Sequence, residues 1–175
     1  HTYDRLLRNH PRKRWTPTKL ARKRWSMGLF VWYFGTQGTR LKWPEVGHHT
    51  ILVGPRYKDH IRDIFIRGRL ADDMSLYVHR PSVTDPSVAP AGDDTFYALS
   101  PVPHLGIGDT DWATEAEPYR QKMQKMLEDR LLPGLSDHLT EQLIFTPNSF
   151  QTRYLSPYGS GFSIEPRILQ SAYFR

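Results

Sequence analysis

Histidines and carboxylates are the residues of this sequence that could carry acid–base or metal chemistry. The candidates for a metal site are His48, His49, Asp59, His60, Asp63, Asp72, Asp73 and His79. No pair among them has a specific ligand spacing such as His-Glu-x-x-His, so solvated charges or histidines at the edge of a core are the simpler interpretation. We therefore predict no metal ion. For a catalytic acid or base the candidates are Glu165 and His79, and a hydrogen-bonded framework role is the competing interpretation for each.

Two glycine-containing motifs resemble known sites only in part. Gly106 and Gly108 begin a dinucleotide fingerprint after an expected strand, but Asp111 stands where a third glycine must allow close helix packing. The 159–161 segment, Gly-Ser-Gly, is not the Gly-x-Ser-x-Gly elbow that exposes a nucleophilic serine. We expect the first motif to form a turn that leads into a helix. We do not expect the second motif to form the active site of a hydrolase.

Composition removes several further classes of function. The chain has no cysteine, which excludes disulfides, thiolate catalysis, iron–sulfur clusters and Cys-type zinc sites. Its longest apolar run, from Met27 to Phe34, is far shorter than the roughly 20 residues that span a bilayer, and we expect neither a membrane span nor a secretion signal.

The positive charge is concentrated at the N-terminus. Residues 1–24 hold nine Lys or Arg and one acid, whereas the rest of the chain holds fifteen and seventeen. With Trp15 interleaved, this segment suits an anionic surface, either nucleic-acid phosphates or lipid head groups, and a solvated arm is a third possibility. We therefore divide the chain into a basic arm or linker, residues 1–24, and a domain, residues 25–175.

Aromatic residues make up 13% of the chain and recur at alternate positions of the expected strands. Because alternate strand residues share a face, three groups could each form one wall of an apolar channel. These groups are Phe30, Trp32 and Phe34; Tyr77 and His79; and Phe96 and Ala98. Ordinary core packing explains the same pattern equally well.

The elements that must position these residues follow from hydrophobic periodicity and turn signals. Strands are expected at residues 26–34, 49–53, 74–79, 95–102 and 141–146. Helices are expected from Tyr57 to near Gly68 and from Pro118 to Pro133, and a turn or short helix is expected at residues 147–155. Strands and helices without regular βαβ alternation favour an α+β fold with helices packed on a mixed β-sheet.

Several segments, read in order, are similar to the middle of bacterial-type phytoene desaturases, which are flavin-dependent carotenoid oxidoreductases. These segments are 26–35 (SMGLFVWYFG), 70–79 (LADDMSLYVH), 101–106 (PVPHLG), 161–166 (GFSIEP) and 170–175 (QSAYFR). The resemblance extends over nearly all of the chain from Ser26 onward. It implies the substrate-binding domain of a monoamine-oxidase-like flavoprotein, without the Rossmann domain that binds FAD. The family's flavin-binding segments would lie before His1 and after Arg175.

The resemblance also implies a function. The whole enzyme would dehydrogenate phytoene to more conjugated carotenes with FAD as the electron acceptor, as a peripheral protein on the cytoplasmic side of the membrane. This segment would bind the long apolar isoprenoid, and we expect no cofactor-binding residues in it. The expected substrate-binding residues are Phe30, Trp32, Phe34, Tyr77, Phe96, Phe145 and Phe162.

Two other readings of the chain remain open. The first is a non-catalytic module that binds an apolar ligand or a membrane surface. The second is nucleic-acid binding by the arm, which we rank lower because the excess of positive charge ends at residue 24.

Overall fold

The computed structural model describes residues 2–170, so residues 171–175 of the predicted domain lie outside the described part. Its strands are β1 (Gly28–Thr36), β2 (His49–Leu52), β3 (Leu76–His79), β4 (Asp94–Val102) and β5 (Leu139–Phe145). Its α-helices are α1 (Pro17–Ala21), α2 (Tyr57–Arg62), α3 (Trp112–Arg130) and α4 (Pro147–Arg153). Short 3-10 or π turns are η1 (Thr2–Leu6), η2 (Asp63–Arg67), η3 (Pro81–Val83), η4 (Pro86–Val88), η5 (Leu135–Asp137), η6 (Pro157–Gly159) and η7 (Ile168–Gln170).

The five strands form one sheet in the order β2-β3-β4-β1-β5, and all five strands expected from sequence are present within two residues of their predicted bounds. Every neighbouring pair is antiparallel, so the expectation of a mixed sheet was wrong. The reason is the position of β1. Strands β4 and β5 run parallel to one another across the α3 connection, but β1 lies between them and is antiparallel to both. The α+β class is confirmed.

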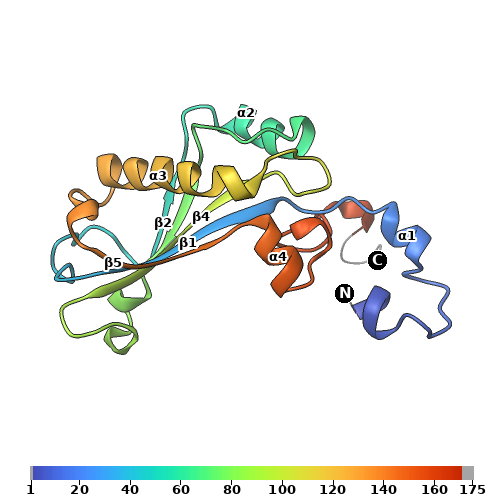
Figure 1. Cartoon of the computed structure of the whole chain (residues 1–175), viewed down its shortest axis with the longest axis horizontal. Helices are drawn as coiled ribbons and strands as arrows, with labels where there is room; N and C mark the ends of the chain where they lie inside the picture. The colour runs from blue at the N-terminus through green and yellow to red at the C-terminus, as the bar shows by residue number, and fades with distance from the viewer. Residues whose placement is uncertain (1, 171–175) are drawn as a thin grey trace.

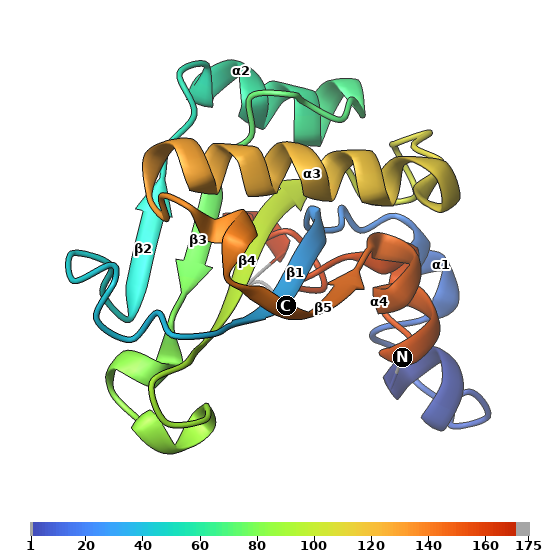
Figure 2. The ribbon, with the colours of Figure 1, turned by 60° about the vertical axis from the view of Figure 1, so that its left-hand side comes forward.

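One face of the sheet forms the main hydrophobic core. Along β1, alternate side chains point to opposite faces, and Phe30, Trp32 and Phe34 are almost fully buried on the face that packs against α3. Figures 1 and 2 show α3 lying across this face, with α2 on the same side. Figure 1 shows α4 on the opposite side of the sheet, at the end nearer the chain termini.

Helix α3 begins at Trp112, six residues before the predicted start at Pro118. Asp111 caps the helix by accepting a hydrogen bond from the Ala113 N–H at 3.0 Å. Trp112 is buried, and its ring lies 5.7 Å from that of Phe30 and 6.1 Å from that of Tyr119. This cap and this packing outweigh the cost of an internal proline, about 3 kcal/mol. The buried stripe beyond Pro118 is confirmed at Tyr119, Met123 and Leu127.

The turn that carries Gly106 and Gly108 is confirmed as a turn before α3. The Ile107 N–H donates to the His104 carbonyl at 3.1 Å, and the loop packs against Gly68, the residue that ends η2. Gly68 has φ +65°, and a Cβ there would lie 2.1 Å from the Ile107 oxygen. A side chain at residue 68 would therefore push the two segments apart.

A buried ion pair joins β3, β4 and the loop after β1. The Arg80 guanidinium donates to both Asp94 carboxylate oxygens at 3.1 and 2.7 Å, and Ser82 and Thr39 donate to the same carboxylate at 2.6 and 2.9 Å. Burial alone would raise the pKa of Asp94, but the hydrogen bonds from Arg80, Ser82 and Thr39 outweigh it and hold the pKa below its ordinary value. Arg80 also donates to the backbone oxygens of four loop residues: Thr39, Arg40, Trp43 and Val46.

None of the helices within residues 2–170 is both long enough and apolar enough to cross a bilayer. In the basic arm the described elements are η1 and α1, and a backbone bridge between Trp25 and Ile164 follows directly after it. The proposed boundary at residue 24 stays a prediction.

We predict that Asp94→Ala lowers the free energy of unfolding by about 3–5 kcal/mol, because the buried Arg80 guanidinium loses its carboxylate partner. Denaturant unfolding measures this loss. The control is Asp129→Ala, which removes the exposed pair with Lys125 on α3 and should cost less than about 1 kcal/mol. Equal losses in the two variants would contradict the assigned role of the buried pair.

Candidate functional site

The sheet face that points away from α3 carries a band of aromatic side chains. It begins with His49 on β2, continues through Tyr77 and His79 on β3 and Tyr97 on β4, and reaches Tyr33 on β1 and Phe145 on β5. We call this set the aromatic band. In the strand register His49 lies opposite His79, and Tyr33 lies opposite Tyr97, so the side chains of each pair point to the same face of the sheet.

Ring contacts make the aromatic band continuous across the sheet. The centroid distance is 5.2 Å from His49 to His79, 4.7 Å from His79 to Tyr97, 5.5 Å from Tyr97 to Tyr33 and 5.7 Å from Tyr33 to Phe145. These separations are within the range of favourable aromatic pairs. Among the described residues, Tyr33 remains 40% exposed. The aromatic band is therefore a partly open, mostly apolar surface rather than a closed core.

Near the Phe145 end of the aromatic band, α4 borders a groove of about 720 Å³. Phe150 of α4 and Tyr154, the residue that follows α4, contact the Phe145 ring with centroid distances of 6.5 and 6.0 Å, and both also line the groove. Across the groove lie Trp25 and Phe162, and the basic arm contributes Tyr3, Arg14, Trp15 and Leu20. Aromatic surface thus leads from the sheet to the cationic arm.

The structure separates the substrate-binding residues that the sequence suggested. Phe30, Trp32, Phe34 and Phe96 lie in the core under α3 and are at most 3% exposed, which favours the core-packing explanation for these positions. Three others lie elsewhere: Tyr77 belongs to the aromatic band, Phe145 is its buried end, and Phe162 is 61% exposed at the groove. Substrate contact by any of them stays a prediction.

The two candidates for a catalytic acid or base lie in unrelated surroundings. Glu165 forms ion pairs with Arg24 at 3.0 Å and Arg167 at 2.8 Å, an arrangement typical of a framework residue. His79 contacts two other histidines and Tyr97 and shares no partner with Glu165 among the described contacts. A catalytic role for either stays a prediction.

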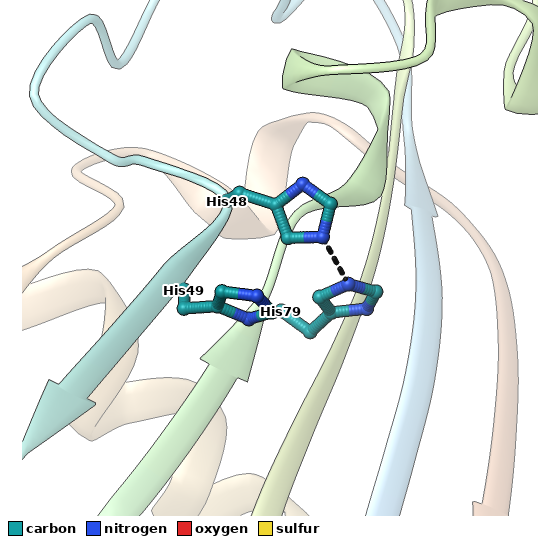
Figure 3. Close-up of side chains that lie close together, drawn as sticks. All are labelled: His48, His49 and His79. Atoms are coloured by element: carbon teal, nitrogen blue, oxygen red, sulfur yellow. Dashed lines mark hydrogen bonds between the residues drawn. The ribbon is translucent and has the colours of Figure 1, made fainter.

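Three histidines meet at the β2–β3 end of the aromatic band. One ring nitrogen from each of His48, His49 and His79 lies within 4.8 Å of the others, although their sequence spacing gave no metal signature. His48 and His79 approach through their Nε2 atoms at 2.7 Å (Figure 3). Burial, followed by the charges of His48 and His49, lowers the pKa of His79. Its ring is therefore favoured in the neutral form.

Three bacterial proteins align with the whole chain. It is 67% identical over 176 residues to the neurosporene-forming phytoene desaturase of Rhodobacter capsulatus and 64% identical to that of Cereibacter sphaeroides. It is 47% identical over 175 residues to the lycopene-forming phytoene desaturase of a Paracoccus species. The chain is thus similar over its whole length to bacterial phytoene desaturases.

The chain spans about a third of the length of the phytoene desaturases it matches: 34% of each of the three proteins named above. No protein-family model matches it.

Sequence reasoning missed the residues of the aromatic band that lie on β1 and β4. Tyr33 and Tyr97 alternate with the residues it selected on β1 and β4, and Leu99 and Val31 share their face. The signal was present as a second set of apolar positions on each strand. Only the position of α3 decides which set remains open, and that position depends on long-range packing.

Burial, followed by the hydrogen bond to Tyr77, raises the pKa of Tyr97 to about 12. We predict that Tyr97→Phe leaves the ultraviolet tyrosine titration between pH 9.5 and 11 unchanged, because Tyr97 stays protonated there while an ordinary tyrosine ionises near pH 10. The reference is the same titration of the wild-type chain, which has nine tyrosines. Loss of one ionising group in this range would show that the Tyr97 hydroxyl is not shielded as described.

Proposed function

We propose that this chain forms the substrate-binding part of a phytoene desaturase and that the aromatic band is the wall against which the isoprenoid lies. The observation that carries the proposal is the open face of the sheet. A row of aromatic rings that continues over all five strands, on a chain 67% identical to a phytoene desaturase, suits an elongated hydrocarbon.

The chemistry of the aromatic band supports this ligand class. A hydrocarbon offers no hydrogen bonds, and each of its buried methylene groups contributes about 0.8 kcal/mol. Polar atoms at the centre of the aromatic band are engaged with one another: the Tyr77 hydroxyl lies 2.6 Å from His49 Nδ1 and is hydrogen-bonded to Tyr97. The ring faces and the neighbouring Leu99 are then the groups left for the ligand.

Within residues 2–170, the segment that resembles a dinucleotide fingerprint does not fit a flavin. The one segment with a partial dinucleotide fingerprint, at Gly106 and Gly108, is a turn packed against Gly68 and followed by the Asp111 cap of α3. We therefore assign FAD binding, as part of the proposal, to other segments of the whole enzyme. The present chain would hold the substrate and keep water from it.

We further propose that the basic arm and the groove face the cytoplasmic side of the membrane, where a water-insoluble substrate is stored. Leu6 of the arm is 70% exposed, and the cations Arg5 and Arg8 on either side of it are also exposed. An exposed leucine between cations suits the boundary between anionic head groups and acyl chains. The groove then connects this boundary with the Phe145 end of the aromatic band.

The wall can be tested by placing a polar group at its centre. We predict that Leu99→Gln lowers kcat/KM for phytoene by about 5- to 30-fold, because an amide there loses up to about 2 kcal/mol of apolar contact. Leu99 is half-buried on the open face. The measurement is the absorbance of the conjugated product, with the intact protein, FAD and phytoene in liposomes.

The matched control is Leu41→Gln, which makes the same exchange at a leucine that is 89% exposed in the loop after β1. It should leave kcat/KM unchanged. Thermal unfolding of both variants separates a loss of contact from a loss of fold. If both variants turn over phytoene at the wild-type rate, the open face does not hold the substrate.

The membrane contact can be tested by removing charge from the arm. We predict that replacing Arg5, Arg8 and Arg22 by Gln weakens binding to vesicles with anionic lipid by about a hundredfold, because each cation near the surface contributes about 1 kcal/mol. All three side chains are exposed. Sedimentation of the intact protein with the vesicles measures the effect.

A control variant with three exposed cations outside the arm replaced by Gln, at Lys42, Lys125 and Arg130, should bind vesicles like the wild type. Equal binding by the native and charge-neutralised arms would reject the membrane role.

A further inference from the structure

The three-histidine cluster has a geometry that the sequence spacing concealed. His48 precedes β2, His49 is the first residue of β2, and His79 is the last residue of β3. The ladder places His49 directly opposite His79, so the two rings share a face and stack with an interplanar angle of 18°. Figure 3 shows the three rings converging from these two neighbouring strands. The cluster is therefore held on rigid antiparallel backbone rather than on a free loop.

The outer nitrogens of two of the rings are held by oxygen atoms. His48 Nδ1 lies 2.6 Å from the Thr84 hydroxyl, and His49 Nδ1 lies 2.6 Å from the Tyr77 hydroxyl. When the Thr84 hydroxyl donates to the Pro81 carbonyl at 3.2 Å, it accepts from His48 Nδ1–H. His48 then carries its lone pair on Nε2, toward the cluster. A ring nitrogen held from behind by an oxygen is the arrangement found in histidines that bind metals.

The ring nitrogens of His79 do not all have hydrogen-bond partners. With the proton of His48 on Nδ1, the 2.7 Å contact between the two Nε2 atoms requires His79 to donate. His79 Nδ1 is then left with a lone pair, and this atom is buried without a hydrogen-bond partner among residues 2–170. A buried nitrogen lone pair without a partner costs free energy. The cluster is therefore not explained as a self-contained hydrogen-bond network.

We propose that His48, His49 and His79 bind a divalent transition-metal ion of the Zn²⁺ type. Three neutral imidazoles suit zinc, copper or nickel, and the absence of a carboxylate from the cluster disfavours calcium and magnesium. Zinc–nitrogen bonds of about 2.0–2.1 Å in tetrahedral geometry require nitrogens about 3.3 Å apart. The ion would replace the His48–His79 hydrogen bond and widen that contact from 2.7 Å. The proton of His79 would move from Nε2 to Nδ1, which leaves the Nε2 lone pair for the ion. The fourth position would hold water.

The site would lie at the end of the aromatic band and would tie edge strand β2 to β3. This inference does not depend on the proposed desaturase function, because metal binding can be measured without turnover. A ligand bound only by the folded state also raises the midpoint of thermal unfolding.

The test is calorimetric titration of the intact protein with Zn²⁺, combined with thermal unfolding. At Zn²⁺ concentrations that fill the site, we expect the wild type to bind one ion more than His49→Gln. If the variant still binds the ion, its affinity should be at least about tenfold weaker than that of the wild type. Zn²⁺ should raise the unfolding midpoint of the wild type more than that of the variant. His49 is exposed, so this exchange leaves the fold intact.

The matched control is His10→Gln, which removes an exposed histidine of the arm and should bind Zn²⁺ like the wild type. Thr84→Val removes the oxygen behind His48 without touching a ligand, and it should weaken binding by about 10- to 100-fold. Equal Zn²⁺ affinity and stoichiometry in the wild type, His49→Gln and His10→Gln would overturn the proposal.

Discussion

The buried pair between Arg80 and Asp94 is the constraint on which the organisation of this sheet depends. The guanidinium is 2% exposed and neutralises a carboxylate that is fully buried, while its remaining N–H groups satisfy carbonyl oxygens of the loop after β1. A buried charge of this kind is tolerated only when the geometry satisfies nearly every donor and acceptor. The backbone N–H of Arg80 also donates to the His48 carbonyl at 2.9 Å, so the same residue fixes the approach of His48 to His79.

The sheet then divides the chain into two chemical environments. On one face α3 buries Phe30, Trp32 and Phe96, so the domain has a core large enough to hold its strands in register. On the other face Tyr33 and Tyr97 stay accessible, and α4 covers only the Phe145 end. The core and the open face thus use alternate residues of the same strands, which allows the open face to vary without emptying the core.

Local signals in the sequence were sufficient for the strands, and long-range packing decided the rest. Hydrophobic runs and turn residues located all five strands, but they could not tell which side of β1 would be covered, because both sides of that strand are apolar. The start of α3 was misplaced since proline at residue 118 is a strong local signal, whereas the burial of Trp112 against Phe30 is visible only in three dimensions. The meeting of His48 with His79 depends likewise on strand pairing across 31 positions.

The position of β1 between β4 and β5 has a consequence for biosynthesis. This most apolar strand is made before both of its ladder partners, and the first of them, β4, begins 58 residues after β1 ends. At ribosomal rates of about 5–20 residues per second, β1 waits roughly 3–12 seconds for that partner. During this interval both of its edges and both of its faces are uncovered, so the nascent chain presents a segment that chaperones bind and that pairs with other unfinished chains. Synthesis rate and chaperone supply would then govern how much of this protein reaches its folded state.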